Sequence, residues 1–346
     1  MRQGNRDEAF MRAALIEARR GLGQTSPNPA VGAILVVGNR IVARAHHWQA
    51  GAAHAEVECL KQFGKRIPKG ATLYVTLEPC STTGRTGPCT NVLIEAGLSK
   101  LVVGALDPNP RHSGRGIKLL TKAGLQVRTG VLATECAELN EAFNKWIQTG
   151  RPFVIAKCGM SLDGRLTAPP AEGRWLTSLA SRQHAHRLRA QVDAILVGAE
   201  TVRVDDPRLT VRGLRGARQP RRVVLSRSGS LPAKARILTD RFADRTLVFV
   251  EIDLGVLLDR LGAKEITSVL IEGGGKLLGQ ALDQRLIDKV QVYVAPIFTG
   301  GPIVAFAGAG ASSTSGAARL DRVRYEKIGP DICVTGYPSH DGIVAE

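Results

Sequence analysis

The sequence predicts two α/β domains, and three observations support this fold class. The chain has 346 residues, which is about twice the length of a typical domain. Short apolar runs that suit strands alternate with amphipathic segments that suit helices, as in α/β domains with a partly parallel sheet. A turn cluster, Thr149-Gly-Arg-Pro152, interrupts this alternation, which then starts again. We therefore expect one domain over residues 1–149 and a second, different one over residues 150–346.

The first half alternates between strand and helix from its start. Periodic apolar positions indicate the helices, and apolar runs bounded by Gly, Pro or Asn indicate the strands. The expected helices are residues 6–20, 54–64, 89–96, 117–123 and 134–146. The expected strands are residues 31–37, 41–45, 72–77, 100–105 and 125–128.

The second half repeats the alternation with different spacings. A helix is expected over residues 179–190, an arginine-rich loop after residue 197, and an apolar helix after the glycines at 273–275. The expected strands are residues 153–158, 194–197, 222–225, 247–250, 268–271, 290–295 and 332–336.

Charge and composition limit the classes of function. Lys and Arg number 47 against 31 Asp and Glu, a net charge of +16, which indicates an anionic partner such as nucleic acid or a phosphorylated metabolite. The excess is spread over both halves, which favours a basic surface with local phosphate contacts. No apolar run approaches the roughly 20 residues of a membrane span, and the N-terminal residues do not resemble a secretory signal. We expect a cytoplasmic protein without a membrane partner.

The six cysteines are scattered, so a disulfide framework is not expected. Four of them, Cys59, Cys136, Cys158 and Cys333, lie inside apolar patterns and are expected in the core.

The remaining two cysteines belong to a predicted metal site. His54-Ala-Glu56 opens one expected helix, Cys80 follows a strand in Glu78-Pro-Cys80, and Cys89 opens another helix after a proline. A catalytic zinc takes three His or Cys ligands and leaves one position for water. Because Glu56 lies about 200° around the helix from His54, we expect it to move protons rather than bind metal. The alternative is an ordinary loop histidine and two unrelated thiols.

This pattern resembles the zinc-dependent cytidine deaminase superfamily, in which a Glu that does not bind zinc is the general acid/base. The longer loop between the cysteines, Glu78-Pro-Cys-Ser-Thr-Thr-Gly-Arg-Thr-Gly-Pro-Cys89, is similar to the bifunctional deaminase–reductases of riboflavin biosynthesis. Further similar segments lie in both halves: Ser26-Pro-Asn-Pro-Ala-Val-Gly32, Asp107-Pro-Asn-Pro110, Lys157-Cys-Gly-Met-Ser-Leu-Asp-Gly-Arg165, Asp205-Asp-Pro-Arg-Leu-Thr-Val-Arg212 and Ile271-Glu-Gly-Gly-Gly275.

The resemblance implies a cytidine-deaminase-like three-layer domain followed by a dihydrofolate-reductase-like α/β domain. The first would bind Zn²⁺ through His54, Cys80 and Cys89 and use Glu56 to deaminate 2,5-diamino-6-ribosylamino-4(3H)-pyrimidinone 5′-phosphate. The second would use NADPH to reduce the ribosyl group to ribityl. Matched residue by residue, the NADPH contacts are Gly159, Trp175, Thr201, Asp205, Gly274, Gly275, Lys276, Leu277, Leu278, Gly279 and Gln280. The matched substrate contacts are Arg189, Leu209, Arg212 and Glu272.

The residues themselves support the second site less strongly than the first. Glycines between a strand and a helix let backbone N–H groups approach a phosphate, but a simple tight turn uses glycines too. Arg suits a phosphate because its guanidinium binds two oxygens at once, although Arg189 and Arg212 could equally be solvated, and Trp175 could be a core aromatic. The chain also departs from the family at Thr82 (for His), Gly87 (for Pro), Gly173 (for Ser) and Ser226-Arg227 (for Asp-Ser).

Two alternative functions remain open on the sequence. The net charge would suit a nucleic-acid deaminase of the same superfamily, but the wide cysteine spacing and the enzyme-like second half favour a small phosphorylated pyrimidine and no nucleic acid. A non-catalytic zinc- or nucleotide-binding regulator would have no use for Glu56. We also expect the chain to form a homo-oligomer.

Overall fold

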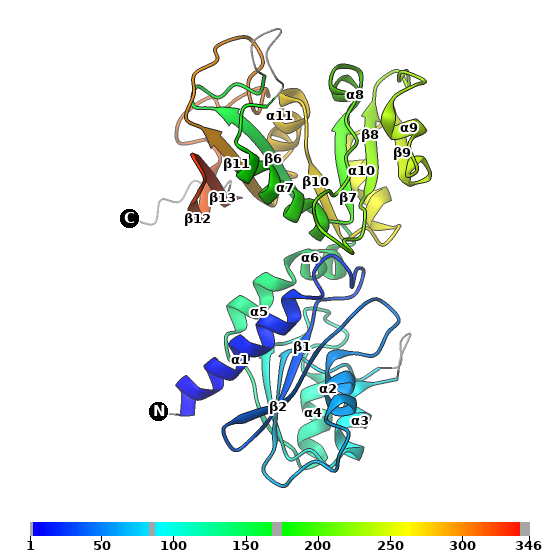
Figure 1. Cartoon of the computed structure of the whole chain (residues 1–346), viewed down its shortest axis with the longest axis vertical. Coiled ribbons are helices and arrows are strands. Elements are labelled where there is room, and N and C mark those ends of the chain that lie inside the picture. Colours follow the sequence, from blue (N-terminus) through cyan, green and yellow to red (C-terminus); the bar gives the residue numbers. More distant parts are fainter. Residues whose placement is uncertain (1–2, 83–86, 168–174, 340–346) are drawn as a thin grey trace. The chain divides into compact units, whose positions relative to one another are not determined.

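The structure, a computed structural model, describes residues 3–82, 87–167 and 175–339. The chain forms two compact units, Met1–Gly150 and Arg151–Glu346 (Figure 1). None of the helices in these described ranges is long and apolar enough to cross a membrane.

The first unit is built on a mixed five-stranded sheet with the order β2-β1-β3-β4-β5. Strand β1 is antiparallel to both β2 and β3, whereas β3, β4 and β5 are parallel to one another. The carboxyl ends of β3 and β4 therefore meet at one edge of the sheet. The strands are β1 Gly32–Val37, β2 Arg40–His46, β3 Thr72–Leu77, β4 Lys100–Ala105 and β5 Gln126–Arg128.

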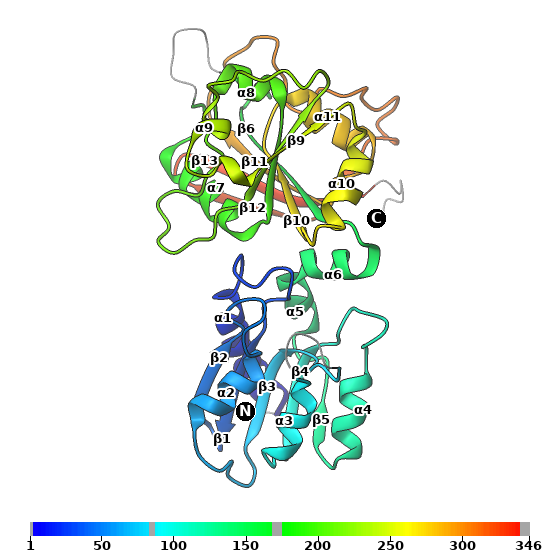
Figure 2. The same cartoon turned by 90° about the vertical axis from the view of Figure 1, so that its right-hand side faces the viewer.

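Helices cover both faces of this sheet, which confirms the three-layer expectation (Figures 1 and 2). Side chains alternate along each strand, so Leu73 and Val75 pack under α2, α3 and α4 while Tyr74 packs under α1 and α5. Cys59 and Cys136 are buried in these two cores, as expected. The helices are α1 Gln3–Arg19, α2 Ala55–Phe63, α3 Cys89–Glu95, α4 Arg115–Lys122, α5 Ala133–Leu139 and α6 Glu141–Thr149.

The prediction of a single helix over residues 134–146 is wrong, because the chain forms two helices, α5 and α6, with a break at Asn140. The side-chain amide of Asn140 accepts a hydrogen bond from the Ala30 N–H (2.8 Å) and donates one to the Ala30 carbonyl (2.9 Å). Asn140 is buried, and this pair of bonds ties the helix break to the proline-rich loop before β1.

The second unit is built on an eight-stranded sheet with the order β12-β13-β11-β6-β10-β7-β8-β9. The six strands from β11 to β9 are parallel, whereas β13 is antiparallel to β11 and to β12. The strands are β6 Phe153–Ser161, β7 Ala194–Gly198, β8 Arg221–Ser226, β9 Thr246–Val250, β10 Ser268–Ile271, β11 Lys289–Ala295, β12 Arg319–Ile328 and β13 Asp331–Ser339. Sequence reasoning missed β12, whose side chains are almost all exposed and therefore lack apolar alternation.

Helices also cover both faces of this second sheet. Leucines of α10 and α11 pack with β6, β7 and β10 in the main core, and α7 lies over Tyr293 on the other face. Cys158 and Cys333 are buried, as expected. The helices are α7 Leu179–Gln191, α8 Ala199–Asp205, α9 Arg236–Thr239, α10 Leu254–Gly262 and α11 Gly275–Asp283. The residues of helix α8 were expected to belong to the arginine-rich loop after residue 197, and this part of the prediction is wrong.

Candidate metal centre and cofactor site

The predicted metal ligands lie together at the ends of three elements of the first unit. His54 precedes the first residue of α2, Cys80 lies shortly after β3, and Cys89 is the first residue of α3. Their ligand atoms all lie within 4.8 Å of one another. His54 Nδ1 is 3.2 Å from the Cys89 sulfur and 3.5 Å from the Cys80 sulfur.

These distances and atoms fit a zinc ion. With zinc–nitrogen and zinc–sulfur bonds near 2.0 and 2.3 Å, two neighbouring tetrahedral ligands lie about 3.5 Å apart. The thiol of Cys89 and the ring of His54 stabilise the Cys80 thiolate and lower the pKa of Cys80, although burial opposes this. The backbone N–H of Cys89 also donates to the Cys80 sulfur (3.3 Å). One nitrogen and two sulfurs leave the fourth position for water, as in catalytic zinc sites.

Glu56 lies beside this cluster in the first turn of α2 and is 3% exposed. Burial raises the pKa of its carboxyl group, and the charge of His54 partly opposes that rise. A hydrogen bond links Glu56 to the thiol of Cys89. A carboxylate with a raised pKa is a stronger base than an exposed one, which suits proton uptake beside a metal that binds water.

Sequence reasoning missed two polar residues at this centre. The His47 ring is buried and lies edge-on to His54, with 5.2 Å between ring centroids. Its nitrogens contact the Asn28 amide (3.1 Å) and the Ala53 carbonyl (3.0 Å). A lone histidine after a strand carries no spacing signal, although Asn28 belongs to the segment Ser26-Pro-Asn-Pro that the family resemblance had singled out.

Two of the departures from the family pattern, Thr82 and Gly87, lie in the described part of the metal loop. Thr82 Oγ1 lies 3.5 Å from His112 Nδ1, and Gly87 is exposed with open space around its Cα. Gly173 lies outside the described residues. In the second unit Ser226 is buried and accepts a hydrogen bond from the Gly229 N–H (3.0 Å), whereas Arg227 is exposed.

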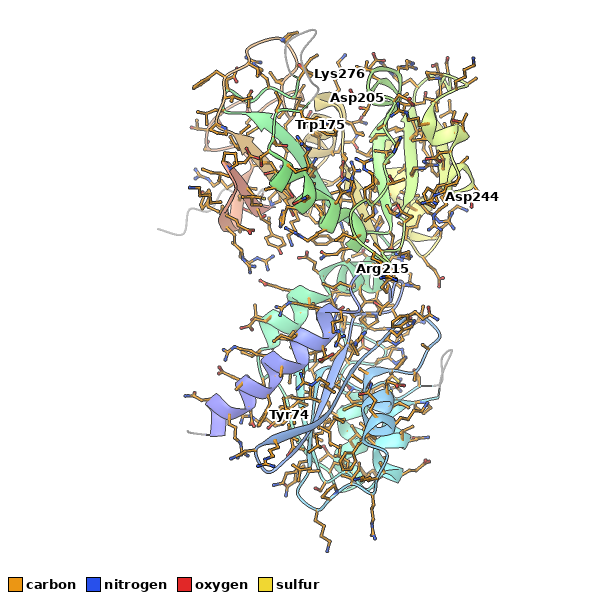
Figure 3. The ribbon with its side chains drawn as sticks, viewed as in Figure 1. Tyr74, Trp175, Asp205, Arg215, Asp244 and Lys276 are labelled. Carbon is orange, nitrogen blue, oxygen red and sulfur yellow. The ribbon has the colours of Figure 1, made fainter. Side chains whose placement is uncertain are left out.

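The expected cofactor residues of the second unit gather where parallel strands end. Gly159 lies late in β6, Thr201 lies in the helix after β7, and Gly274 follows β10. A Cβ atom on Gly274 would lie 3.6 Å from Thr201 Oγ1, so these two are neighbours. Figure 3 shows Trp175, Asp205 and Lys276 at the same end of this unit. Ligands of open α/β sheets bind at the carboxyl ends of the strands.

Trp175 is not a core aromatic. It is 53% exposed, and the Arg182 guanidinium lies over its ring, 5.1 Å from the centroid.

Glycines at the start of α11 have two different environments. Gly274 has a φ of +39° and is exposed, as is Lys276. By contrast, a Cβ on Gly275 would lie 1.9 Å from the Val304 carbonyl oxygen, and one on Gly279 would lie 2.2 Å from the Gly308 nitrogen. Leu277 and Leu278 are buried. Within 274–280, the exposed groups are therefore those of Gly274 and Lys276, with Gln280 half-buried.

The expected substrate residues Arg189 and Glu272 bind each other. The Arg189 guanidinium of α7 donates to both carboxylate oxygens of Glu272 at 2.7 and 2.5 Å, and also to the Thr210 carbonyl at 3.1 Å. Lys157 Nζ lies 4.0 Å from the same carboxylate. Burial would raise the pKa of Glu272, but Arg189 and Lys157 outweigh it and lower the pKa to about 2. Glu272 is therefore a buried anion.

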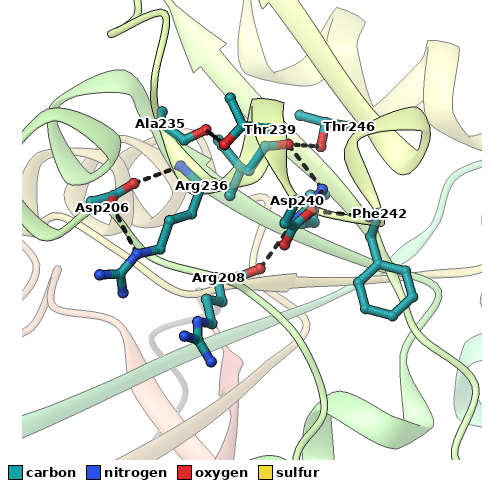
Figure 4. A network of polar contacts seen from close by, with 10 residues as sticks. Asp206, Arg208, Ala235, Arg236, Thr239, Asp240, Phe242 and Thr246 are labelled. Carbon is teal, nitrogen blue, oxygen red and sulfur yellow. Dashed lines mark hydrogen bonds and ion pairs between the residues drawn. The ribbon is translucent and has the colours of Figure 1, made fainter.

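The loop that holds Leu209 and Arg212 is anchored by a second buried guanidinium. Leu209 is buried with a φ of +50°, and the Arg212 N–H donates to His186 Nδ1 (3.3 Å). Arg222 is 1% exposed, donates to the Arg208 carbonyl (3.2 Å) and forms two bonds of 2.8 Å with Asp240. Figure 4 shows Arg208 and Asp240 in this polar network. Sequence reasoning treated Arg222 only as a strand residue.

Both halves of the chain match known families. Residues 4–105 match the cytidine and deoxycytidylate deaminase zinc-binding region, and residues 152–334 match the RibD C-terminal domain. Riboflavin biosynthesis protein RibD of Synechocystis sp. is 39% identical, over 96% of this chain and 96% of its own length. The chain belongs to the RibD family.

Solved RibD structures share the whole fold. Acinetobacter baumannii RibD aligns with a TM-score of 0.89 and 36% identity, over 97% of this chain and 100% of its own. The Thermotoga maritima deaminase/reductase aligns with a TM-score of 0.87 and 34% identity, over 97% and 99%. This RibD-family chain is a bifunctional enzyme of riboflavin biosynthesis, with a zinc-dependent deaminase domain and a dihydrofolate-reductase-like, NADPH-dependent reductase domain. The expected fold class, cofactors and activity are confirmed.

Proposed function

We propose that the first unit hydrolyses the 2-amino group of 2,5-diamino-6-ribosylamino-4(3H)-pyrimidinone 5′-phosphate, with His54, Cys80 and Cys89 as the zinc ligands. The cluster of one imidazole and two thiols beside a buried carboxyl group carries this proposal. Zinc, when bound, lowers the pKa of a water ligand to around 7. Oxygen from such a water would replace the amino group on the ring carbon, and the amino group would leave as ammonia.

Glu56 supplies the proton transfers of this reaction. Its carboxylate takes the proton from the attacking water and gives it to the departing amino group, so it is the general base and then the general acid. The raised pKa of Glu56 makes its carboxylate a stronger base than an exposed one, which suits the uptake of the proton from water. The hydrogen bond to Cys89 supports a carboxyl group aimed at the metal position.

The second unit reduces the deaminated product with NADPH. We propose that Gly274, Lys276, Thr201 and neighbouring residues at the carboxyl ends of β7 and β10 bind the cofactor. Arg189, Leu209, Arg212 and Glu272 line the substrate side. NADPH, when bound, would supply a hydride to C1 of the ribosyl group; the bond between C1 and the furanose oxygen would break, and that oxygen would take a proton, which gives the ribitylamino product. Because Glu272 and Thr210 accept hydrogen bonds from three of the five N–H groups of Arg189, its role toward the substrate phosphate depends on the second N–H of each terminal nitrogen.

Incubation of the purified protein with the diaminopyrimidine phosphate, with and without NADPH, tests both halves. Without NADPH we expect ammonia and a product in which oxygen replaces the amino group. With NADPH we expect the same product carrying two more hydrogens, together with oxidised cofactor. Mass spectrometry distinguishes the products, and recovery of unchanged substrate in both reactions would contradict the proposal.

The remaining expectations are also proposals. We propose a cytoplasmic location, because six free cysteines suit the reducing cytoplasm.

The basic surface is proposed to attract the substrate and NADPH rather than nucleic acid, and salt-dependent binding of RNA would contradict this. A homo-oligomer is supported by the exposed Tyr325 and Ile332 of the β12–β13 pair, and sedimentation of the full chain measures its mass.

A further inference from the structure

A buried carboxylate, Glu78, lies between the end of β3 and the metal ligand Cys80. It is 5% exposed, and the catalytic scheme above does not use it. Its two oxygens accept hydrogen bonds from four backbone N–H groups. Oε2 accepts from Asp107 (3.2 Å) and Gly114 (2.9 Å), and Oε1 accepts from Gly116 (2.9 Å) and Ile117 (3.3 Å).

The four donors come from the two ends of one segment, residues 107–117, which leads from β4 into α4. Between those ends the segment is held by its own side chains: Asp107 accepts from the Asn109 N–H (2.8 Å), and Asn109 accepts from the Arg111 N–H (3.0 Å). Glu78 therefore joins the beginning of a polar loop to its end. A single carboxylate therefore fixes the positions of both ends of the loop.

The same loop contacts the segment that carries Cys80. A Cβ on Gly116 would lie 2.3 Å from the Pro79 carbonyl oxygen, so only glycine allows this approach. Further along the same segment, Thr82 Oγ1 lies 3.5 Å from His112 Nδ1 of the loop. These contacts lie at the carboxyl ends of the parallel strands β3 and β4, where ligands of α/β sheets bind.

We propose that Glu78 is a positioning residue of the deaminase, which holds loop 107–117 against the Cys80 segment so that the loop forms one wall of the substrate site. This inference rests on the proposed deamination. Glu78 acts on the loop through its hydrogen bonds to backbone N–H groups. Its loss should therefore weaken substrate binding more than it slows the chemical step.

The test is Glu78→Gln in the full-length, zinc-loaded protein. The glutamine keeps the length of the side chain, but its amide nitrogen would face two of the four N–H donors, so two of the four hydrogen bonds that hold the loop are lost. We expect kcat/KM of deamination to fall roughly 10-fold or more, mostly through KM, with zinc content unchanged. Glu78→Asp keeps the charge but is one methylene too short to reach both ends, so KM should rise in this variant as well.

Two internal comparisons separate positioning from a loss of folded protein. A smaller folded fraction lowers the apparent kcat and leaves KM unchanged. The reductase of the same chain, assayed on deaminated substrate, should keep its wild-type rate. Glu95→Gln is the matched control, because Glu95 is an exposed carboxylate at the end of α3, and its deamination kinetics should match those of the wild type.

An unchanged KM in Glu78→Gln, loss of zinc from it, or a wild-type KM in Glu78→Asp would each overturn the inference. Failure of the wild type and of Glu95→Gln to deaminate would instead contradict the proposed function.

Discussion

The buried pair of Arg189 and Glu272 should make the second unit sensitive to acid and to loss of one charge. The ordinary pKa of a Glu is near 4.5, and that of Glu272 is about 2. At about 1.4 kcal/mol per pKa unit, the ionised Glu272 contributes roughly 3 kcal/mol to the free energy of unfolding. Because the pKa is lower in the folded state, this contribution is complete above the unfolded pKa and is lost as the pH falls from about 4.5 toward 2.

Glu272→Gln removes the negative charge of this side chain at neutral pH, so the Arg189 guanidinium loses its counterion. Only 15% of the Arg189 side chain is exposed to solvent. Breaking a buried pair costs about 3–5 kcal/mol, which agrees with the value from the pKa. With a urea slope of about 2 kcal/mol/M, the unfolding midpoint of this unit should fall by roughly 1.5 M. Hydrogen exchange of β10 peptides during urea titration of the full chain reports on this unit alone.

The matched control is Glu200→Gln, because Glu200 also pairs with an arginine, Arg203, at 2.8 Å, but is 76% exposed. An exposed pair contributes less than about 1 kcal/mol, so the midpoint should hardly move. The acid sensitivity between about pH 4.5 and 2 should also be smaller in Glu272→Gln than in the wild type. Equal midpoints for the two variants, or an unchanged acid sensitivity, would refute the assignment of Glu272 as a strongly stabilised anion.

Three further changes test the two sites. Cys89→Ser should lose both zinc and deamination activity, because one of the three proposed metal ligands is removed. NADPH-dependent reduction of deaminated substrate should persist, and metal analysis together with assays of deamination and reduction measures these outcomes. Glu56→Gln should keep zinc and lose about 10²–10⁴-fold in deamination rate, and near-normal turnover would remove Glu56 from its role. Gly274→Val should weaken NADPH binding, measured by isothermal titration, because a β-branched side chain is strained at a φ of +39° and would hold the phosphates away from the backbone.

The sequence predicted those elements whose signal is local. The bounds of β3, β4 and β10 agree with the expected strands at 72–77, 100–105 and 268–271, because each is an apolar run that turn residues delimit. The three proposed metal ligands could be predicted to lie together because each His or Cys begins, precedes or follows a recognisable element.

Features that depend on distant partners could not be predicted in the same way. Nothing near Arg189 indicates a pair with Glu272, which lies 83 residues further along the chain. The break at Asn140 depends on Ala30, and β12 forms by pairing with β13 rather than by apolar alternation. Glu78 was visible only as part of the metal motif, because its partners are backbone N–H groups, which every sequence contains.

The two glycine environments of α11 restrict how cofactor preference can evolve in this enzyme. Gly275 and Gly279 lie one helical turn apart and face the backbone at 304–308, so any side chain there separates the helix from that segment. Substitutions at these two positions should destabilise the fold and lower the amount of folded protein. Selection should therefore remove them, whatever cofactor is available. In the proposed cofactor site, inherited changes in the recognition of the nucleotide should therefore accumulate at Lys276 and Gln280, whose side chains are at least partly exposed, and in the strand-end loops beside them.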